Sequence, residues 1–423
     1  MINDVNELIN LIENSKRQEK KTSLDKMVSL CRLFNNPENG LPIIHVGGTN
    51  GKGSTVTYIK SILMEAGFNV GTFISPYVIC FNERISVNND YISDIDLLKY
   101  GNLVIDKCKS NKLDLPAFFD FVTIIALLYF KDLYLDKLID YVILEVGMGG
   151  IFDSTNVCNP LVSIITNVDY DHMSILGNSL EEIWQNKLGI LKENTPFICF
   201  KSNYDDLVIA KAKEMHALGR LRLVRKSDCT NVRIINNQTM FDYLGIENIK
   251  LNLLGKYQAE NAALAIEAIN TLNEILDLNI SIDIIKSGLE KAFWPGRLEI
   301  VHNNPLVILD GAHNVDAINR LYEFINMYHF TKPLRLVIAI SANKEVEKMI
   351  RIIEPLANEV VYTEFNYRRS DSAYHLFELS NHNNKILMEN EDEIIDYILN
   401  DEAYDNILFG SLYFVSEMRK KFK

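Results

Sequence analysis

Short apolar runs alternate along the chain with longer segments in which apolar residues recur at helical spacing. Runs in which nearly every residue is apolar are typical of strands buried on both faces, and their alternation with helices predicts a mostly parallel sheet. In the first part of the chain these runs occupy residues 42–46, 71–74, 141–146, 161–167 and 196–200. Residues 1–34 are predicted to form two amphipathic helices with a break near residues 20–23.

A Pro-Gly break divides the pattern in two. Residues 258–272 are predicted to be an Ala-rich helix, and Phe-Trp-Pro-Gly-Arg at residues 293–297 stops the next helical segment. The alternation then restarts. Strands are predicted at residues 305–309, 334–340, 359–364, 385–388 and 406–409, with helices at residues 315–328, 344–356, 373–379, 391–399 and 412–420.

We therefore predict an α/β protein of two domains. The N-terminal domain spans residues 1–296 and carries a mostly parallel sheet, with a small β-rich excursion near residues 204–254. The C-terminal domain spans residues 297–423 and is a smaller, Rossmann-like α/β domain. Two domains agree with a length of 423 residues, which is too long for one ordinary core.

Composition narrows the classes of function. The net charge of −13 argues against a nucleic-acid partner, which would need a basic surface. No run of about 18 apolar residues occurs, so we expect no membrane span, and the polar N-terminus does not resemble a signal peptide. The six cysteines show no C-x-x-C pairing, which predicts free, mostly buried thiols in a reducing cytoplasm and argues against a zinc site.

The run His-Val-Gly-Gly-Thr-Asn-Gly-Lys-Gly-Ser-Thr at residues 45–55 carries the strongest chemical signal. It joins a predicted strand to a helical segment at residues 56–65, so its backbone N–H groups and the helix dipole favour an anion. Lys52 adds a positive charge, and Ser54 adds a hydroxyl suited to magnesium. The run departs from the general P-loop pattern, because Val46 stands where its first glycine belongs and Gly53 follows the lysine. A Gly-rich turn with an exposed lysine therefore stays open as the alternative.

Charged side chains also follow other predicted strands. Glu145 ends one strand before a Gly-rich tail at residues 147–150, and Asp171-His172 follows the next strand. Ligands bind beyond the carboxyl ends of the strands in open α/β sheets, so Glu145 is placed to hold magnesium. The alternatives are a surface salt bridge for Glu145 and an ordinary packed or surface histidine for His172.

Asp310 and Arg297 have two readings each, and the pattern gives one for Lys187. Asp310 ends a strand of the second domain, where it is either a ligand-binding residue or the N-cap of the following helix. Arg297 lies at the domain junction and either reaches nucleotide phosphates or forms an interdomain salt bridge. Lys187 lies in a helical segment at residues 180–191, where the pattern alone favours a solvated lysine.

Seven runs, taken in order, resemble the folylpolyglutamate synthase and dihydrofolate synthase family, a branch of the Mur-type ATP-dependent ligases. They are Gly-Thr-Asn-Gly-Lys-Gly-Ser at residues 48–54, Ser-Pro at 75–76 with Phe-Asn-Glu-Arg-Ile at 81–85, Glu-Val-Gly-Met-Gly-Gly at 145–150, Asp-His at 171–172 with Leu-Gly at 176–177, Pro-Gly-Arg-Leu-Glu at 295–299, Asp-Gly-Ala-His-Asn at 310–314 and Gly-Ser-Leu-Tyr at 410–413. The likeness spans nearly the whole chain, and its phosphate loop is the family's own variant. The resemblance implies a P-loop-containing, ATP-binding central domain of the Mur type at residues 1–296 and a Mur-type C-terminal domain at residues 297–423.

The resemblance also implies roles for individual residues. It assigns catalytic roles to Lys52, Lys187 and His172, with Lys187 carbamylated to N6-carboxylysine, and metal binding to Ser75, Glu145 and His172. It assigns ATP binding to Thr49, Asn50, Gly51, Lys52, Gly53, Ser54, Asn261, Arg297 and Asp310. It assigns the pterin or folate side to Phe118, Phe119, Asp120, Phe152, Asp153 and Ser154. The implied cofactors are ATP and two magnesium ions, with potassium as a further candidate.

Three positions depart from the family pattern. Tyr77 stands where His usually follows Ser-Pro, Ile151 stands where Arg usually follows the glycines, and Asp120 replaces a common Glu. Ile151 removes a charge near the expected substrate, so the departures affect the expected substrate preference more than the ATP chemistry.

The function that we expect is ATP-dependent ligation of L-glutamate to a folate, and also to dihydropteroate, through an acyl phosphate. The expected partners are these small molecules alone, bound by a cytoplasmic monomer. Two alternatives stay open: a Mur-type ligase for a nucleotide-linked cell-wall precursor, and a nucleotide-dependent switch without ligase activity.

Overall fold

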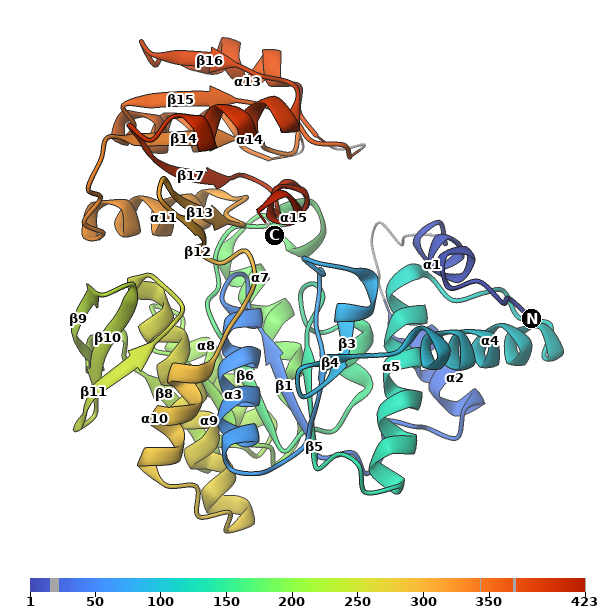
Figure 1. The fold of residues 1–423 in the computed structure, drawn as a ribbon. Coiled ribbons are helices and arrows are strands. Elements are labelled where there is room, and N and C mark those ends of the chain that lie inside the picture. Colours follow the sequence, from blue (N-terminus) through green and yellow to red (C-terminus); the bar gives the residue numbers. More distant parts are fainter. Residues whose placement is uncertain (16–22, 343, 368–369, 423) are drawn as a thin grey trace. The chain divides into compact units, whose positions relative to one another are not determined.

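The computed structural model describes residues 1–15, 23–342, 344–367 and 370–422 (Figure 1). The chain forms two compact units. The first unit comprises residues 1–229, 243–246 and 260–291, and the second comprises residues 230–242, 247–259 and 292–423. The helix α9 (Lys256–Leu276) belongs to both units, and the domain boundary between residues 296 and 297 stays a prediction.

The first unit is built on an eight-stranded sheet in the order β4-β3-β2-β5-β1-β6-β7-β8. The strands are β1 (Ile43–Gly47), β2 (Val70–Phe73), β3 (Ile85–Val87), β4 (Asp90–Tyr91), β5 (Tyr141–Glu145), β6 (Val162–Ile165), β7 (Phe197–Phe200) and β8 (Leu221–Val224). Only β3 and β4 pair in the antiparallel sense, so six strands are parallel. The parallel strands β1, β2, β5, β6 and β7 are buried at every position, as the apolar runs predict.

Helices cover both faces of this sheet. They are α1 (Val5–Glu13), α2 (Asp25–Leu33), α3 (Lys52–Glu65), α4 (Asp94–Ser110), α5 (Phe118–Leu135), α6 (Met173–Leu176), α7 (Leu180–Lys187), α8 (Asp205–Glu214), α9 and α10 (Ile282–Lys291). In Figure 1, α3, α9 and α10 lie on one side of the sheet, and α1, α2, α4 and α5 lie on the other. Ile43, Phe73 and Leu144 pack into the core under this second group of helices.

The second unit contains a six-stranded sheet in the order β12-β13-β17-β14-β15-β16. Its strands are β12 (Glu299–Asn303), β13 (Leu306–Asp310), β14 (Leu334–Ile338), β15 (Glu359–Tyr362), β16 (Lys385–Leu387) and β17 (Asp405–Phe409), and only β12 is antiparallel. Its helices are α11 (Val315–Met327), α12 (Val346–Ile353), α13 (Ala373–Leu379), α14 (Glu391–Asn400) and α15 (Leu412–Lys421). The first three helices contribute to one apolar core and the last two to another, so this sheet is also covered on both faces.

The β-rich excursion expected near residues 204–254 differs in detail from the expectation. Residues 205–214 form α8, and β8 joins the edge of the first unit's sheet. The remainder is a separate three-stranded sheet of β9 (Cys229–Ile235), β10 (Gln238–Tyr243) and β11 (Ile246–Leu251). Asn236, Asn237, Leu244 and Gly245 connect these strands in two-residue turns with positive φ, the geometry of tight hairpins.

The predicted α/β fold class is confirmed, and most element ends differ by a few residues. Among the larger shifts, α3 begins at Lys52 rather than near residue 56, because Gly51 takes a left-handed conformation and starts the helix directly after the loop. Of the predicted N-terminal break, residues 20–22 lie outside the described residues. Within the described part of the chain no helix is long and apolar enough to cross a membrane. All six cysteines are free, and four of them are buried.

Candidate active site

The loop between β1 and α3 needs glycine at two positions. Gly48 and Gly51 have φ values of +143° and +84°, which side chains rarely adopt. A Cβ atom at Gly48 would lie 1.9 Å from Thr166 Oγ1, and one at Gly51 would lie 2.4 Å from Asn261 Oδ1. These contacts place Asn261, predicted from the family pattern, directly beside the start of α3.

The end of β6 holds the same loop in place. The Thr49 and Asn50 N–H groups donate to the carbonyl and side-chain oxygens of Asn167 at 2.7 and 2.6 Å. Thr166 Oγ1 donates to the Asn50 carbonyl at 2.6 Å. Sequence reasoning missed Thr166 and Asn167 as supports of the loop. The available signal was that polar residues follow the strand at its carboxyl end, where the loops of neighbouring parallel strands meet.

Two lysines converge on one backbone carbonyl in this loop. Lys52 Nζ donates to the Gly48 oxygen at 3.2 Å and to the Thr49 oxygen at 3.0 Å, and Lys187 Nζ donates to the Gly48 oxygen at 2.9 Å. The solvated-helix reading of Lys187 is wrong, since the residue is 3% exposed. Lys52 is half-buried and Ser54 is buried, so the reading of the loop as a turn with an exposed lysine is also wrong.

Burial sets the chemistry of Lys187. Loss of hydration lowers the pKa of this ammonium to about 7, and the positive charge of Lys52 acts in the same direction. The nearby Asp171 and Asp153 oppose the change. Near neutral pH a large share of Lys187 is therefore an uncharged amine, the form that reacts with electrophiles.

Glu145 and Ser75 lie together at the ends of adjacent strands. Ser75 N–H donates to Glu145 Oε2 at 2.9 Å, and Glu145 is 4% exposed, so the surface-salt-bridge reading is wrong. No cluster of three or more His, Cys, Asp or Glu residues that could hold a metal is found among the described residues. Magnesium needs no such cluster, because it binds through one or two carboxylates together with water and substrate phosphates. The oxygen atoms of Glu145 and Ser75 therefore fit a magnesium site.

His172 begins the short helix α6 in a left-handed conformation, with φ of +50°. Its side chain is about half exposed, and its Nε2 lies 3.9 Å from Asp171 Oδ2. Neither observation decides between a metal ligand and a surface histidine, so the ligand role stays a prediction.

The predicted folate-side residues come from two segments that the structure joins. Ser154 Oγ donates to Asp120 Oδ1 at 2.6 Å, and both side chains are buried. Phe119 packs so closely on the Gly-rich tail that a Cβ at Gly147 would lie 2.4 Å from its ring. Phe152, two residues before Ser154, is half-buried.

Arg84 lies near this group and belongs to the run at residues 81–85, but no role of its own was predicted for it from the sequence. It is 5% exposed, and its guanidinium lies over the rings of Tyr77 and Phe118 at 4.9 and 5.3 Å from their centroids. Tyr77, a departure from the family pattern, also donates from its hydroxyl to Glu13 Oε1 at 3.2 Å. Ile151, a second departure, is 40% exposed. Tyr77 thus contacts both the Arg84 guanidinium, through its ring, and Glu13, through its hydroxyl.

Arg297 and Asp310 lie together in the second unit. Asp310 is buried and accepts from the N–H groups of Leu298 at 3.0 Å and Ala312 at 2.9 Å. Burial raises the pKa of Asp310, and the charge of Arg297 acts against this. The helix-cap reading of Asp310 is wrong, because the N-cap of α11 is Asn314.

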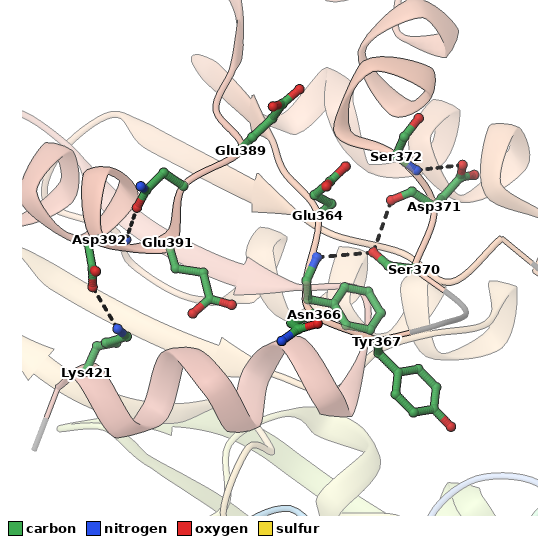
Figure 2. Close-up of a pocket in the computed structure, with 12 residues that line it drawn as sticks. Glu364, Asn366, Tyr367, Ser370, Asp371, Ser372, Glu389, Glu391, Asp392 and Lys421 are labelled. Atoms are coloured by element: carbon green, nitrogen blue, oxygen red, sulfur yellow. Dashed lines mark hydrogen bonds and ion pairs between the residues drawn. The ribbon is translucent and has the colours of Figure 1, made fainter.

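A cavity of about 790 Å³ also lies in the second unit. Figure 2 shows its wall, formed by the loops after β15 and β16 and by the end of α15. Its charged side chains are mainly acidic, including Glu364, Glu389 and Glu391, and Asp392 pairs with Lys421 at 2.7 Å. None of the predicted site residues lines this cavity.

Comparisons with known proteins agree with the sequence motifs. Residues 121–269 match the Mur ligase middle domain, and residues 296–410 match the glutamate ligase domain of Mur ligases. The chain is 38% identical over 413 residues to the dihydrofolate synthase/folylpolyglutamate synthase of Bacillus subtilis, covering 95% of each protein. It is 32% identical over 361 residues to the dihydrofolate synthetase of Saccharomyces cerevisiae, covering 81% of each.

Solved structures show the same fold. The apo form of L. casei FPGS has a TM-score of 0.86 and 28% identity, covering 99% of both chains. An FPGS-AMPPCP-folate complex has a TM-score of 0.85, 28% identity and the same coverage. The folylpolyglutamate synthase of Thermotoga maritima has a TM-score of 0.83 and 29% identity, covering 99% of this chain and 96% of the other. This chain therefore belongs to the folylpolyglutamate synthase and dihydrofolate synthase family of Mur-type ligases.

Proposed function

We propose that this chain uses ATP to join L-glutamate to a folate, forming an amide, ADP and phosphate, and that dihydropteroate is a second acceptor. The observation that carries the proposal is the strand-to-helix loop in which Lys52 and Lys187 meet at the Gly48 carbonyl. A loop of backbone N–H groups beside the Lys52 ammonium suits the phosphates of a nucleotide. The names of the relatives support a folate acceptor rather than a cell-wall precursor.

The chemistry starts from a poor electrophile. A carboxylate does not react readily with an amine, so its oxygen first takes the γ-phosphoryl group of ATP, which gives an acyl phosphate and ADP. The α-amine of glutamate then attacks the acyl carbon, and phosphate leaves as the amide forms. Catalysis of this kind depends on positioning and charge stabilisation, which Lys52 supplies beside the loop.

We assign the remaining nucleotide contacts by combining the geometry with the family pattern. The proposed ATP-binding residues are Thr49, Asn50, Gly51, Lys52, Gly53, Ser54, Asn261, Arg297 and Asp310. The close approach of Asn261 to Gly51 supports its place in this group. The AMPPCP complex of a related FPGS supports nucleotide binding in general.

Magnesium is the proposed metal. Ser75, Glu145 and His172 would hold it, and two ions with potassium as a further cation remain part of the proposal. The metal would neutralise part of the negative charge on the triphosphate. The buried Glu145 carboxylate and the Ser75 loop, already joined by a hydrogen bond, support this assignment.

Lys187 is proposed to be carbamylated. Its neutral amine would attack the carbon of CO2 and lose one proton, which leaves a carbamate anion with two oxygen atoms. Its burial, which favours the neutral amine, supports this step. An anionic oxygen donor suits a magnesium site better than an ammonium does.

The folate side is proposed to comprise Phe118, Phe119, Asp120, Phe152, Asp153 and Ser154. The hydrogen bond between Ser154 and Asp120 supports treating the two segments as one surface. We further propose that the protein works in the cytoplasm as a monomer, with small molecules as its partners. Its free thiols and negative net charge support this setting.

Product analysis tests the function. The protein is incubated with ATP, magnesium and L-glutamate, and dihydropteroate or tetrahydrofolate is offered separately. Mass spectrometry should find each acceptor lengthened by one or more glutamates. Absence of a glutamylated product from both acceptors, with folded protein, would contradict the proposal, and a product from only one would identify the true acceptor.

A further inference from the structure

A chain of hydrogen bonds inside the first unit connects β1 with the Gly-rich tail that follows β5. His45 on β1 is fully buried, and its Nε2 lies 2.8 Å from Thr155 Oγ1. Thr155 Oγ1 donates to Asp153 Oδ1 at 2.6 Å, and Asp153 Oδ2 accepts from the Met148 N–H at 2.9 Å. Met148 lies within the tail at residues 147–150, so the chain ends on the backbone of that loop.

The direction of each bond in this chain follows from the number of protons available. The single proton of the Thr155 hydroxyl goes to the Asp153 carboxylate, so the hydroxyl must accept a bond from His45 Nε2–H. A neutral imidazole has one N–H, which leaves His45 Nδ1 as an acceptor facing Cys158 Sγ at 3.7 Å.

The surroundings of His45 and Cys158 favour the uncharged form of both side chains. Burial lowers the pKa of His45 to about 3, and the charge of Lys192 acts in the same direction. Burial also raises the pKa of the Cys158 thiol to about 12. The imidazole therefore stays neutral and the thiol keeps its proton near neutral pH, so one tautomer of His45 satisfies every bond.

Two glycines of the loop at residues 147–150 pack closely against neighbouring residues. A Cβ at Gly147 would lie 2.4 Å from the Phe119 ring, and one at Gly150 would lie 2.7 Å from the Lys187 carbonyl oxygen. Glu145 ends β5 two residues before Gly147. A displacement of the Met148 amide would therefore be passed to Glu145, Phe119 and Lys187, three residues of the proposed site.

We propose that His45, Thr155 and Asp153 form a positioning relay that holds the loop at residues 147–150 in the geometry needed for ligation. The proposal rests on the proposed ligase function. His45 and Thr155 act through the loop and not by reacting with substrate, whereas Asp153 also belongs to the proposed folate side. Thr155 sets the direction of the relay because its hydroxyl is both acceptor and donor. Thr155 and His45 thereby become determinants of catalytic efficiency from inside the core.

Thr155→Val tests the relay, because valine keeps the shape of threonine and removes the hydroxyl. Thr155→Ser keeps the hydroxyl and serves as the rescue variant. Thr123→Val is the matched control, since the Thr123 hydroxyl is also buried but has no hydrogen-bond partner among the described residues. We expect Thr155→Val to lower kcat/KM for the folate about 10- to 100-fold, mainly through kcat, while Thr155→Ser and Thr123→Val stay within about threefold of wild type.

Hydrogen exchange of the Met148 amide gives a readout that needs no activity. It should be faster in Thr155→Val than in wild type and unchanged in Thr123→Val. If Thr155→Val does not fold, His45→Leu breaks the bond to the Thr155 hydroxyl and should likewise speed exchange and lower kcat. Equal behaviour of Thr155→Val and Thr123→Val, or failure of Thr155→Ser to restore kcat, would overturn the relay. If wild type ligates no glutamate, the proposed function fails, while Met148 exchange still decides the relay.

Discussion

Lys187 shows how strongly surroundings decide the chemistry of a residue in this protein. A lysine in a polar helical segment is expected to be solvated, yet this one is 3% exposed and bonded to the Gly48 carbonyl. That partner is 139 positions away in sequence, so helical periodicity carries no information about it. The family resemblance identified the residue, and its burial explains why the pKa of its amine is lowered.

Glu145 provides the residue-scale prediction. Glu145→Ala removes a buried carboxylate at the end of β5 and leaves the Ser75 N–H without this acceptor. We expect at least a tenfold higher magnesium concentration for half-maximal activity, because loss of a ligand or its support typically costs about 10- to 100-fold in affinity or activity. Magnesium titrations of both proteins check this, and superimposable curves would count against the ligand role.

At the scale of elements, the most buried charged side chain of the second unit lies near the start of a strand and not at its carboxyl end. Arg335 near the start of β14 is fully buried, where it pairs with Glu359 and Asp401. Its guanidinium also lies 4.3 and 4.2 Å from the ring centroids of Tyr397 and Tyr404. Ligands of open α/β sheets bind at the opposite edge, so this network is expected to serve stability.

Arg335→Ala should therefore destabilise the protein by about 3–5 kcal/mol, because it leaves the buried Glu359 carboxylate without its charge partner. Arg351→Ala is the matched control. The Arg351 pair with Glu347 is exposed, and breaking it should cost less than about 1 kcal/mol. Chemical denaturation measures both values, and equal losses of stability would show that the buried network contributes nothing special.

Glu417 on α15 is expected to make the stability of the fold depend on pH. Burial raises the pKa of Glu417 to about 7, well above the ordinary range of a glutamate, and a hydrogen bond and repulsion from Glu391 act in the same direction. Lys420 and the Asn366 N–H oppose the change. The folded state therefore binds this proton more tightly than the unfolded state. Its contribution to stability is fully present below the unfolded pKa and is lost as pH rises through about 7.

Glu417→Gln keeps a neutral side chain at every pH. We expect the variant to match wild type in Tm near pH 5 and to exceed it near pH 8, since it escapes the ionisation that destabilises wild type. Thermal unfolding across this range measures the difference. Parallel Tm curves for the two proteins would mean that Glu417 keeps its ordinary acidity.

At the scale of the whole molecule, local pattern predicted the two α/β sheets and the main strands, because fully apolar runs such as residues 141–146 can be buried in few other ways. Pattern alone did not predict that Asn167 supports the phosphate loop or that Ser154 bonds Asp120. These contacts depend on the order of strands in the sheet. β1 lies between β5 and β6 in the sheet, although it precedes both strands by more than 90 residues in sequence. The sequence motifs therefore predicted where the site lies, whereas the residues that support it could be recognised only from the order of the strands.

We propose that the loop at residues 48–54 binds ATP for ligation and not for unproductive hydrolysis. The most direct measurement is ADP formed per glutamate ligated, with the folate or glutamate omitted in turn, for wild type and Lys52→Ala. We predict about one ADP per glutamate joined, little ADP formation when either substrate is missing, and near-complete loss of turnover in Lys52→Ala. ADP release without product, or wild-type turnover in Lys52→Ala, would show that this loop does not couple ATP to ligation.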